Sequence, residues 1–218
     1  MLAQALADEA RRPKFAGRRY SVVGAQAAGV FHPKVILQLG KASGRLLAGS
    51  ANMTVAGVAG NLEVVGQVTV AGEDMTAAPL LRAAVEYLLK FTEPGSVARR
   101  QVEWALNRTR WLPTTATAEA VVTLQEGMRV AFLPCSDAMG IAERFVNFIG
   151  DREVQRLVVA SPYWDYDLRA LRTLKERLRV PKASALIQPQ AALYPVQAHP
   201  TLDGFGLFDA NRIPGAAS

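Results

Sequence analysis

Two short groups of polar residues in the first third of the chain could bind and attack an oxyanion. His32 and Lys34 lie two residues apart, and their surroundings are typical of a β-strand. Residues two apart in a strand share a face, so the imidazole and the ammonium would point the same way. A second predicted strand ends directly before Ser50 and Asn52. A turn there would bring a hydroxyl and a carboxamide to the same edge, which predicts a site for a phosphoryl group.

The order of these motifs resembles a known enzyme family. H-x-K is followed by G-S-x-N-M-T, then by Gly57 and by N-x-E, which ends at Glu63. This order resembles the phospholipase D superfamily, whose signature is H-x-K, four residues, Asp, and then G-S-x-N. Residues 31–63 are most similar to the nuclease-like and helicase-associated members, in which G-S-x-N-[LM]-T, a Gly and N-x-E recur. The resemblance predicts a metal-independent phosphodiesterase.

The resemblance also assigns roles to the residues. His32 would be the nucleophile that forms a phosphohistidine. The phosphate-binding groups, which would stabilise the five-coordinate state in place of metal ions, would be Lys34, Ser50 and Asn52. The family's Asp, five residues after the lysine, is Leu39 here, so Glu63 is the candidate for orienting His32. No metal or other cofactor is implied.

The chain supplies only half of such a site. The leaving alkoxide must be protonated as it departs, and water must later be activated, so a second imidazole is needed. The only other histidine, His199, has no H-x-K or G-S-x-N pattern around it. The second motif would come either from a homodimer partner or from a missing part of the chain.

A second resemblance favours the missing segment. Ser161-Pro162-Tyr163-Trp164-Asp165 follows a predicted strand and is similar to the opening of the second repeat in such proteins and in tyrosyl-DNA phosphodiesterases. We therefore expect residues 1–112 to be the C-terminal part of a first phospholipase D-like repeat. Residues 113–218 would be the N-terminal part of a second repeat without its H-x-K motif. The order of motifs favours a shortened chain over a natural homodimer.

The remaining pattern alternates strands with amphipathic helices. Short apolar runs predict strands at 20–23, 35–39, 45–48, 64–71, near 121, and at 128–132, 156–160 and 206–208. Apolar stripes predict helices at 80–91, at 97–108, after a Ser136 cap, and after a cap formed by Asp165 or Asp167. The buried edges of the last two helices would be Ala142, Phe145, Val146 and Ile149, and then Leu168, Leu171, Leu174 and Leu178. The predicted fold class is α/β: a layered phospholipase D-like sandwich with a mixed sheet flanked by helices, which could be incomplete.

Composition excludes several other classes of protein. The 218 residues are 50% apolar and 20% charged, enough to form a sizeable core. No run approaches the roughly 18 apolar residues of a membrane-spanning helix. Cys135 is the only cysteine, so it cannot form an internal disulfide, and we assign it no chemistry. Because no secretory signal is visible either, we expect a cytoplasmic protein.

The positive charge lies in the first half of the chain. Residues 1–110 hold 14 Lys and Arg against 8 Asp and Glu, whereas residues 111–218 hold 11 of each. A basic half attracts phosphate-bearing polymers, which predicts a nucleic acid, most simply DNA, as the partner. A solvated surface without a partner would carry the same charge. The helicase-associated resemblance adds a helicase as a candidate partner.

Two alternative functions fit the same residues. A phosphatidyltransferase or phospholipase would use the same chemistry on lipids. A non-catalytic nucleic-acid-binding module attached to a helicase or a defence system would use the basic half without the histidine. Tyr163 and Trp164 could stack on bases, although packing is the commoner role for aromatic residues after a strand.

Overall fold

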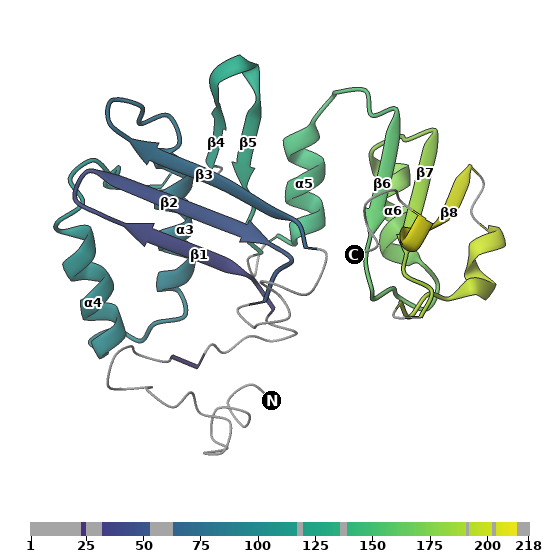
Figure 1. Ribbon diagram of the computed structural model, residues 1–218, viewed down its shortest axis with the longest axis horizontal. Coiled ribbons are helices and arrows are strands. Elements are labelled where there is room, and N and C mark those ends of the chain that lie inside the picture. The colour runs from purple at the N-terminus through teal and green to yellow at the C-terminus, as the bar shows by residue number, and fades with distance from the viewer. Residues whose placement is uncertain are drawn as a thin grey trace. The chain divides into compact units, whose positions relative to one another are not determined.

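The protein is an α/β chain that forms two compact units, Met1–Pro134 and Cys135–Ser218. The computed structural model describes residues 23–24, 32–52, 63–116, 120–135, 139–190, 192–201 and 204–212. These residues contain three small sheets and four α-helices (Figure 1). Each sheet is either wholly antiparallel or wholly parallel, so the described strands do not form the single mixed sheet that was predicted. The predicted strand at 20–23 lies almost wholly outside the described residues.

The first unit is built on a three-stranded antiparallel sheet in the order β1-β2-β3. Its strands are β1 (Val35–Leu39), β2 (Ser43–Gly49) and β3 (Val65–Ala71). One rung pairs Leu37 with Leu46 and Leu46 with Val68, so these apolar side chains share a face. That face packs into the core, whereas Ile36 on the other face is 39% exposed. Val35 and Leu37, on the inner face, both pack against the core.

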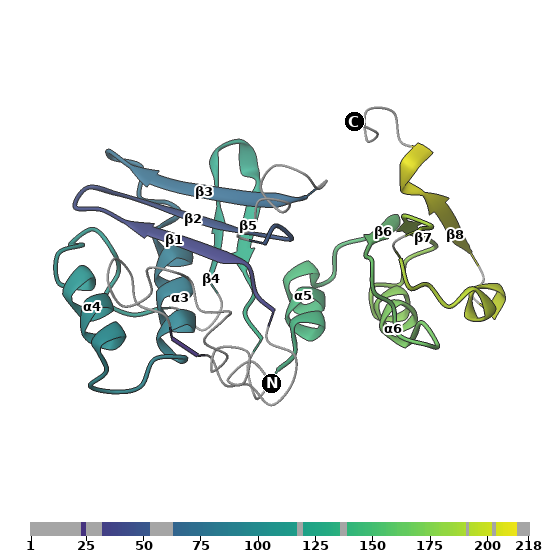
Figure 2. The same cartoon turned by 60° about the horizontal axis from the view of Figure 1, so that its bottom comes forward.

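Helix α3 (Ala78–Leu89) seals the buried face of the sheet, as Figure 2 shows. Pro79 lies in its first turn, where the missing N–H costs no helical hydrogen bond. Leu80, Leu81 and Val85 are each 1% exposed or less. A Cβ atom on Gly44 of β2 would lie only 2.7 Å from Leu81 Cδ2, so the helix lies directly against the sheet at that glycine.

A β-hairpin also packs on α3 and belongs to the first unit. Its strands are β4 (Ala120–Thr123) and β5 (Arg129–Phe132), joined through the 3-10 turn η2 (Gln125–Gly127). Ala120 and Val122 are buried in the same core as α3. The first compact unit ends at Pro134, whereas the predicted division at 112/113 is one between repeats. The assignment of the two parts to repeats stays a prediction.

The second unit holds a parallel sheet in the order β6-β7-β8. Its strands are β6 (Arg156–Ala160), β7 (Lys182–Ile187) and β8 (Phe205–Asp209), and its helices are α5 (Ile141–Ile149) and α6 (Arg169–Arg177). Two 3-10 turns complete it, η3 (Val196–Thr201) and η4 (Ala210–Arg212). None of the helices in the described ranges is long and apolar enough to cross a membrane.

Leu168 occupies the N-cap position of α6, but both predicted carboxylates accept hydrogen bonds from the first N–H groups of the helix. Asp165 Oδ2 accepts a hydrogen bond from the Ala170 N–H at 3.2 Å, and Asp167 Oδ1 accepts one from the Arg169 N–H at 3.3 Å. The predicted buried edge of this helix is confirmed. Leu168, Leu171 and Leu178 are buried, and Leu174 is half-buried.

Two predictions for the helix after β5 are not confirmed: its cap and the burial of Ala142. The predicted cap, Ser136, lies outside the described residues, and the N-cap position of α5 is occupied by Gly140. Ala142 was predicted to face the core, but it is exposed. It lies in the first turn of the helix, whereas Phe145, Val146 and Ile149 are half-buried as predicted.

His199 lies in an aromatic cluster of the second unit. The Tyr194 hydroxyl is 3.0 Å from His199 Nδ1, and the His199 and Phe205 ring centroids are 6.1 Å apart. Trp164 contacts Tyr194 edge-on and donates a hydrogen bond from Nε1 to the Ser161 carbonyl oxygen at 2.8 Å. Trp164 is thus used in packing.

We expect the two faces of the first sheet to differ in their sensitivity to mutation. Leu81→Ala removes a fully buried side chain and should lower the free energy of unfolding by about 2–5 kcal/mol. Ile36→Ala, on the exposed face, should cost about 1 kcal/mol or less. Urea unfolding followed by fluorescence would measure both. Equal losses would mean that Ile36 is also covered in solution.

The aromatic cluster predicts a stability loss at alkaline pH. Burial raises the pKa of Tyr194 above its ordinary value of 10.0, so the folded protein retains this phenolic proton more strongly than the unfolded chain. The resulting stabilisation is complete below pH 10 and is lost as the pH rises through the folded-state pKa. Wild type should therefore lose stability above pH 10 more steeply than Tyr194→Phe. The difference in tyrosinate absorbance between wild type and Tyr194→Phe, followed against pH, isolates the titration of Tyr194. Its midpoint should lie above pH 10, and a midpoint below pH 10 would contradict the prediction.

Candidate functional site

The predicted site residues come from three chain segments that meet at one end of the first sheet. The Gly49 N–H donates to the Lys34 carbonyl oxygen at 3.2 Å, and the Ser50 N–H donates to the Val64 carbonyl oxygen at 2.9 Å. The start of β1, the end of β2 and the start of β3 are therefore neighbours. His32 and Lys34 lie before β1, Ser50 and Asn52 lie after β2, and Glu63 precedes β3.

The first pair in this site is His32 and Lys34, whose side chains touch. Lys34 Nζ lies 3.0 Å from both His32 Nδ1 and His32 Nε2. A neutral imidazole has one acceptor nitrogen, so only one of the two can accept a hydrogen bond from the ammonium at a time. Lys34 Nζ also donates to the His32 carbonyl oxygen at 3.2 Å. His32 is exposed and Lys34 half-buried, so the ring is accessible to a large substrate.

The second pair is Ser50 and Glu63. Ser50 Oγ donates to Glu63 Oε2 at 2.5 Å and accepts a hydrogen bond from the Val64 N–H at 3.0 Å. Together with the Ser50 backbone bond, these contacts extend the β2–β3 ladder by one rung. The single Ser50 O–H proton is directed at a carboxylate, so Ser50 would have to leave Glu63 before it could donate to a phosphate.

The structure thus joins Glu63 to Ser50, a contact that the motif analysis did not anticipate. The sequence places Glu63 directly before the predicted strand at 64–71, but the contact with Ser50 depends on the register of that strand with β2. The predicted role of Glu63 in orienting His32 stays a prediction.

The charges of the two pairs differ, and this sets the direction from which an anion could approach. Lys34 directly precedes β1 and its carbonyl oxygen is bound by the Gly49 N–H, so the alternation of β1, extended by one residue, places it with Ile36 on the face opposite the one that packs on α3. A carboxylate repels a phosphate, whereas an ammonium attracts it. An anion would therefore bind at the His32–Lys34 pair rather than at the Ser50–Glu63 pair.

Asn52 is exposed at the end of a described segment. The rest of its motif, Met53 and Thr54, and the later Gly57 and Asn61 lie outside the described residues. Comparison with known protein families, with curated proteins and with solved structures found no match. No cluster of three or more His, Cys, Asp or Glu side chains that could hold a metal occurs in the parts of the chain that the structure describes.

Gly49 permits the close approach of β3 that holds the site together. A Cβ atom on Gly49 would lie 2.2 Å from the Val64 carbonyl oxygen and 2.8 Å from Val65 Cα, and backbone cannot yield as a side chain can. Gly66, on the same pair of strands, would bring its Cβ no closer than 3.7 Å to the Ala48 carbonyl oxygen. The two glycines therefore form a matched pair of test positions.

We expect Gly49→Ala to lower the free energy of unfolding by about 1–3 kcal/mol, because the β2–β3 ladder must open to admit the methyl group. Gly66→Ala should be neutral or slightly stabilising, since it removes backbone freedom from the unfolded chain. Urea unfolding would give both values, and amide hydrogen exchange of Ser50 would report the local opening. Equal protection of that amide in both variants would contradict the proposed contact.

Proposed function

We propose that the chain carries one half of a metal-independent phosphodiesterase site of the phospholipase D type, acting on nucleic acid. The supporting observation is that H-x-K, G-S-x-N and the glutamate of N-x-E, up to 31 residues apart, reach one edge of a sheet. The contact between Lys34 Nζ and the His32 ring adds to this support. The α/β class of the chain is compatible with such a domain.

In the proposed reaction His32 attacks phosphorus. When a phosphodiester binds, the Lys34 ammonium moves from the imidazole to a non-bridging oxygen, which leaves a ring nitrogen free to attack. A nitrogen–phosphorus bond forms, the bond from phosphorus to the leaving oxygen breaks, and that oxygen takes a proton from a second acid. Water then gives a proton to the conjugate base of that second acid and attacks phosphorus, the nitrogen–phosphorus bond breaks, and His32 is regenerated.

The other site residues divide into two roles in this proposal. Asn52 would donate its amide hydrogens to the phosphoryl oxygens and stabilise the charge that develops there. Ser50 and Glu63 act as positioning residues, because their hydrogen bond holds Ser50, which is two residues before Asn52. Ser50 joins the phosphate cradle only if substrate displaces Glu63 from its hydroxyl.

The second acid would be the imidazole of a homodimer partner or of a further segment of polypeptide. Nucleic acid is favoured over lipid as the substrate because the net charge of +6 lies entirely in residues 1–110, which include the site. The layered phospholipase D-like sandwich and a helicase partner belong to the same proposal.

The test is a nuclease assay in EDTA with single-stranded and double-stranded DNA and RNA. His32→Ala should abolish cleavage, and Lys34→Ala should lower the rate by about 10²–10³-fold, as expected for loss of a group that stabilises developing charge. Lys41→Ala is the matched control, since Lys41 is an exposed lysine in the turn at the other end of β1 and β2. It removes the same charge and should leave the rate unchanged.

Three results would contradict the proposal. Cleavage abolished by EDTA would exclude the mechanism, and cleavage retained by His32→Ala would exclude the nucleophile. Release of a lipid headgroup in detergent, without cleavage of nucleic acid, would instead support the phosphatidyltransferase alternative. If a second copy supplies the acid, the specific activity should rise with protein concentration. An acid-labile covalent adduct, in which one part of the cleaved nucleic acid is joined to the protein through phosphorus, should form on wild type but not on His32→Ala.

A further inference from the structure

Helix α4 (Val97–Leu106) presents a cationic and aromatic face to solvent, away from the candidate site in sequence. Residues 97–110 hold four arginines against one glutamate. Along one side of the helix, at spacings of three or four residues, the exposed side chains are Val97, Arg100, Gln101, Trp104 and Arg108. The Arg108 position continues the end of the helix, because its N–H donates to the Ala105 carbonyl oxygen at 3.0 Å.

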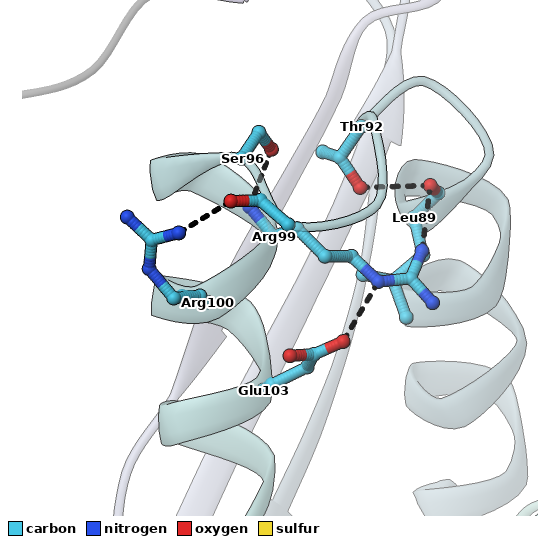
Figure 3. A network of polar contacts seen from close by, with 7 residues as sticks. Leu89, Thr92, Ser96, Arg99, Arg100 and Glu103 are labelled. Carbon is cyan, nitrogen blue, oxygen red and sulfur yellow. Dashed lines mark hydrogen bonds and ion pairs between the residues drawn. The ribbon is translucent and has the colours of Figure 1, made fainter.

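This helix is held in place by a network of polar contacts at its first turn (Figure 3). Ser96 Oγ caps the helix by accepting the Arg99 N–H at 3.1 Å. The Arg99 side chain donates to the Leu89 carbonyl oxygen at the end of α3 and to Glu103 at 2.9 Å. The one acidic side chain of α4 is therefore paired with an arginine. Arg100 donates to the Gly95 carbonyl oxygen with one of its five N–H groups.

Trp104 lies at the centre of the exposed face. Its side chain is 60% exposed, although tryptophan is usually highly buried. The guanidinium of Arg108 lies 4.0 Å from the centroid of its ring, which is a cation–π contact. This contact places the guanidinium over one face of the indole ring. A planar aromatic group would therefore stack on the opposite face, with the positive charge close enough to bind an anion attached to it.

The apolar side of α4 is already used. Val102 and Leu106 pack against the core of the first unit, so the helix has no free apolar face with which to enter a bilayer. The solvent-exposed side of α4 presents the Trp104 ring between Arg100 and Arg108. An aromatic ring can stack on a base and arginines can bind phosphates, so this side complements a nucleic acid. The span from Arg100 to Arg108 is ~12 Å of helix, or about three to four nucleotide rises.

We propose that this face, Arg100–Trp104–Arg108, binds single-stranded nucleic acid. A base stacks on Trp104, and phosphates one to two nucleotides away in either direction along the strand bind the guanidinium groups of Arg100 and Arg108. Stacking requires an unpaired base, so the face discriminates single strands from duplexes. The inference rests on α4 alone and does not depend on His32 or on cleavage.

The test uses the full chain carrying His32→Ala, so that no oligonucleotide can be consumed. Association with a labelled oligothymidylate is measured by fluorescence anisotropy over a series of salt concentrations. Trp104→Ala should weaken binding by about tenfold, whereas Trp104→Phe should retain most of the affinity. Arg100→Gln and Arg108→Gln should each reduce the slope of log affinity against log salt by about 0.7.

Arg169→Gln is the matched control, because it removes one exposed arginine from the second unit and should leave the salt slope unchanged. The proposal is overturned if this control changes the slope as much as Arg108→Gln does, or if Trp104→Ala binds as tightly as its parent. It is also overturned if duplex binds as tightly as single strands. Anionic phosphatidylserine vesicles provide the last comparison, and Trp104-dependent binding to vesicles but not to oligonucleotide would assign the face to membranes.

Discussion

The candidate site depends on the pairing of β2 with a strand on each side. His32 and Glu63 are 31 residues apart, and neither has a local reason to lie near Ser50. The backbone hydrogen bonds of β2 to β1 and to β3 bring all three segments to one edge. Formation of the sheet offsets the conformational entropy that is lost when these segments are ordered. At this edge the pairing requires glycine at position 49. A Cβ atom there would overlap the backbone of Val64 and Val65. The site is therefore fixed by backbone, and only secondarily by the Ser50–Glu63 hydrogen bond.

The sheet buries one face only, and this asymmetry explains how polar chemistry can lie beside a core. α3 covers the inner face, where small or absent side chains such as that of Gly44 let Leu81 approach. The outer face carries Lys34 and half-exposed apolar residues such as Ile36. An ammonium on the inner face would lose its hydration without a compensating partner, whereas on the outer face it stays solvated and available to an anion. Because alternate residues of a strand face opposite sides of the sheet, the residues that stabilise the core and the residues that could bind an anion lie on different faces.

Much of the fold could be predicted from the sequence, because its elements follow strong local patterns. The predicted strands at 35–39 and 156–160 match β1 and β6, and the caps of α6 follow from carboxylates placed before a leucine stripe. β7 was not predicted, since its Lys-Ala-Ser-Ala start has low strand propensity and is held by its two neighbours in the parallel sheet. The membership of Ala120 and Val122 in the first core was missed for a similar reason, because burial against α3 is a tertiary effect. At the site, strand parity predicted that His32 and Lys34 share a face. The Ser50–Glu63 contact required the register of β2 and β3, which no local pattern encodes.

The contacts of the chain's two histidines explain why the proposed site lacks a second imidazole. The sequence holds only His32 and His199, and the two rings have different neighbours. His32 is exposed and in contact with an ammonium, an arrangement suited to an anionic substrate. His199 has the Tyr194 hydroxyl at Nδ1 and the Phe205 ring beside it, and its role in the second unit is accounted for by packing. General acid catalysis requires an imidazole that can reach the leaving oxygen with a proton to donate. If the proposed chemistry operates, the second imidazole therefore belongs to a second copy or a further segment, brought to the edge where β1, β2 and β3 meet.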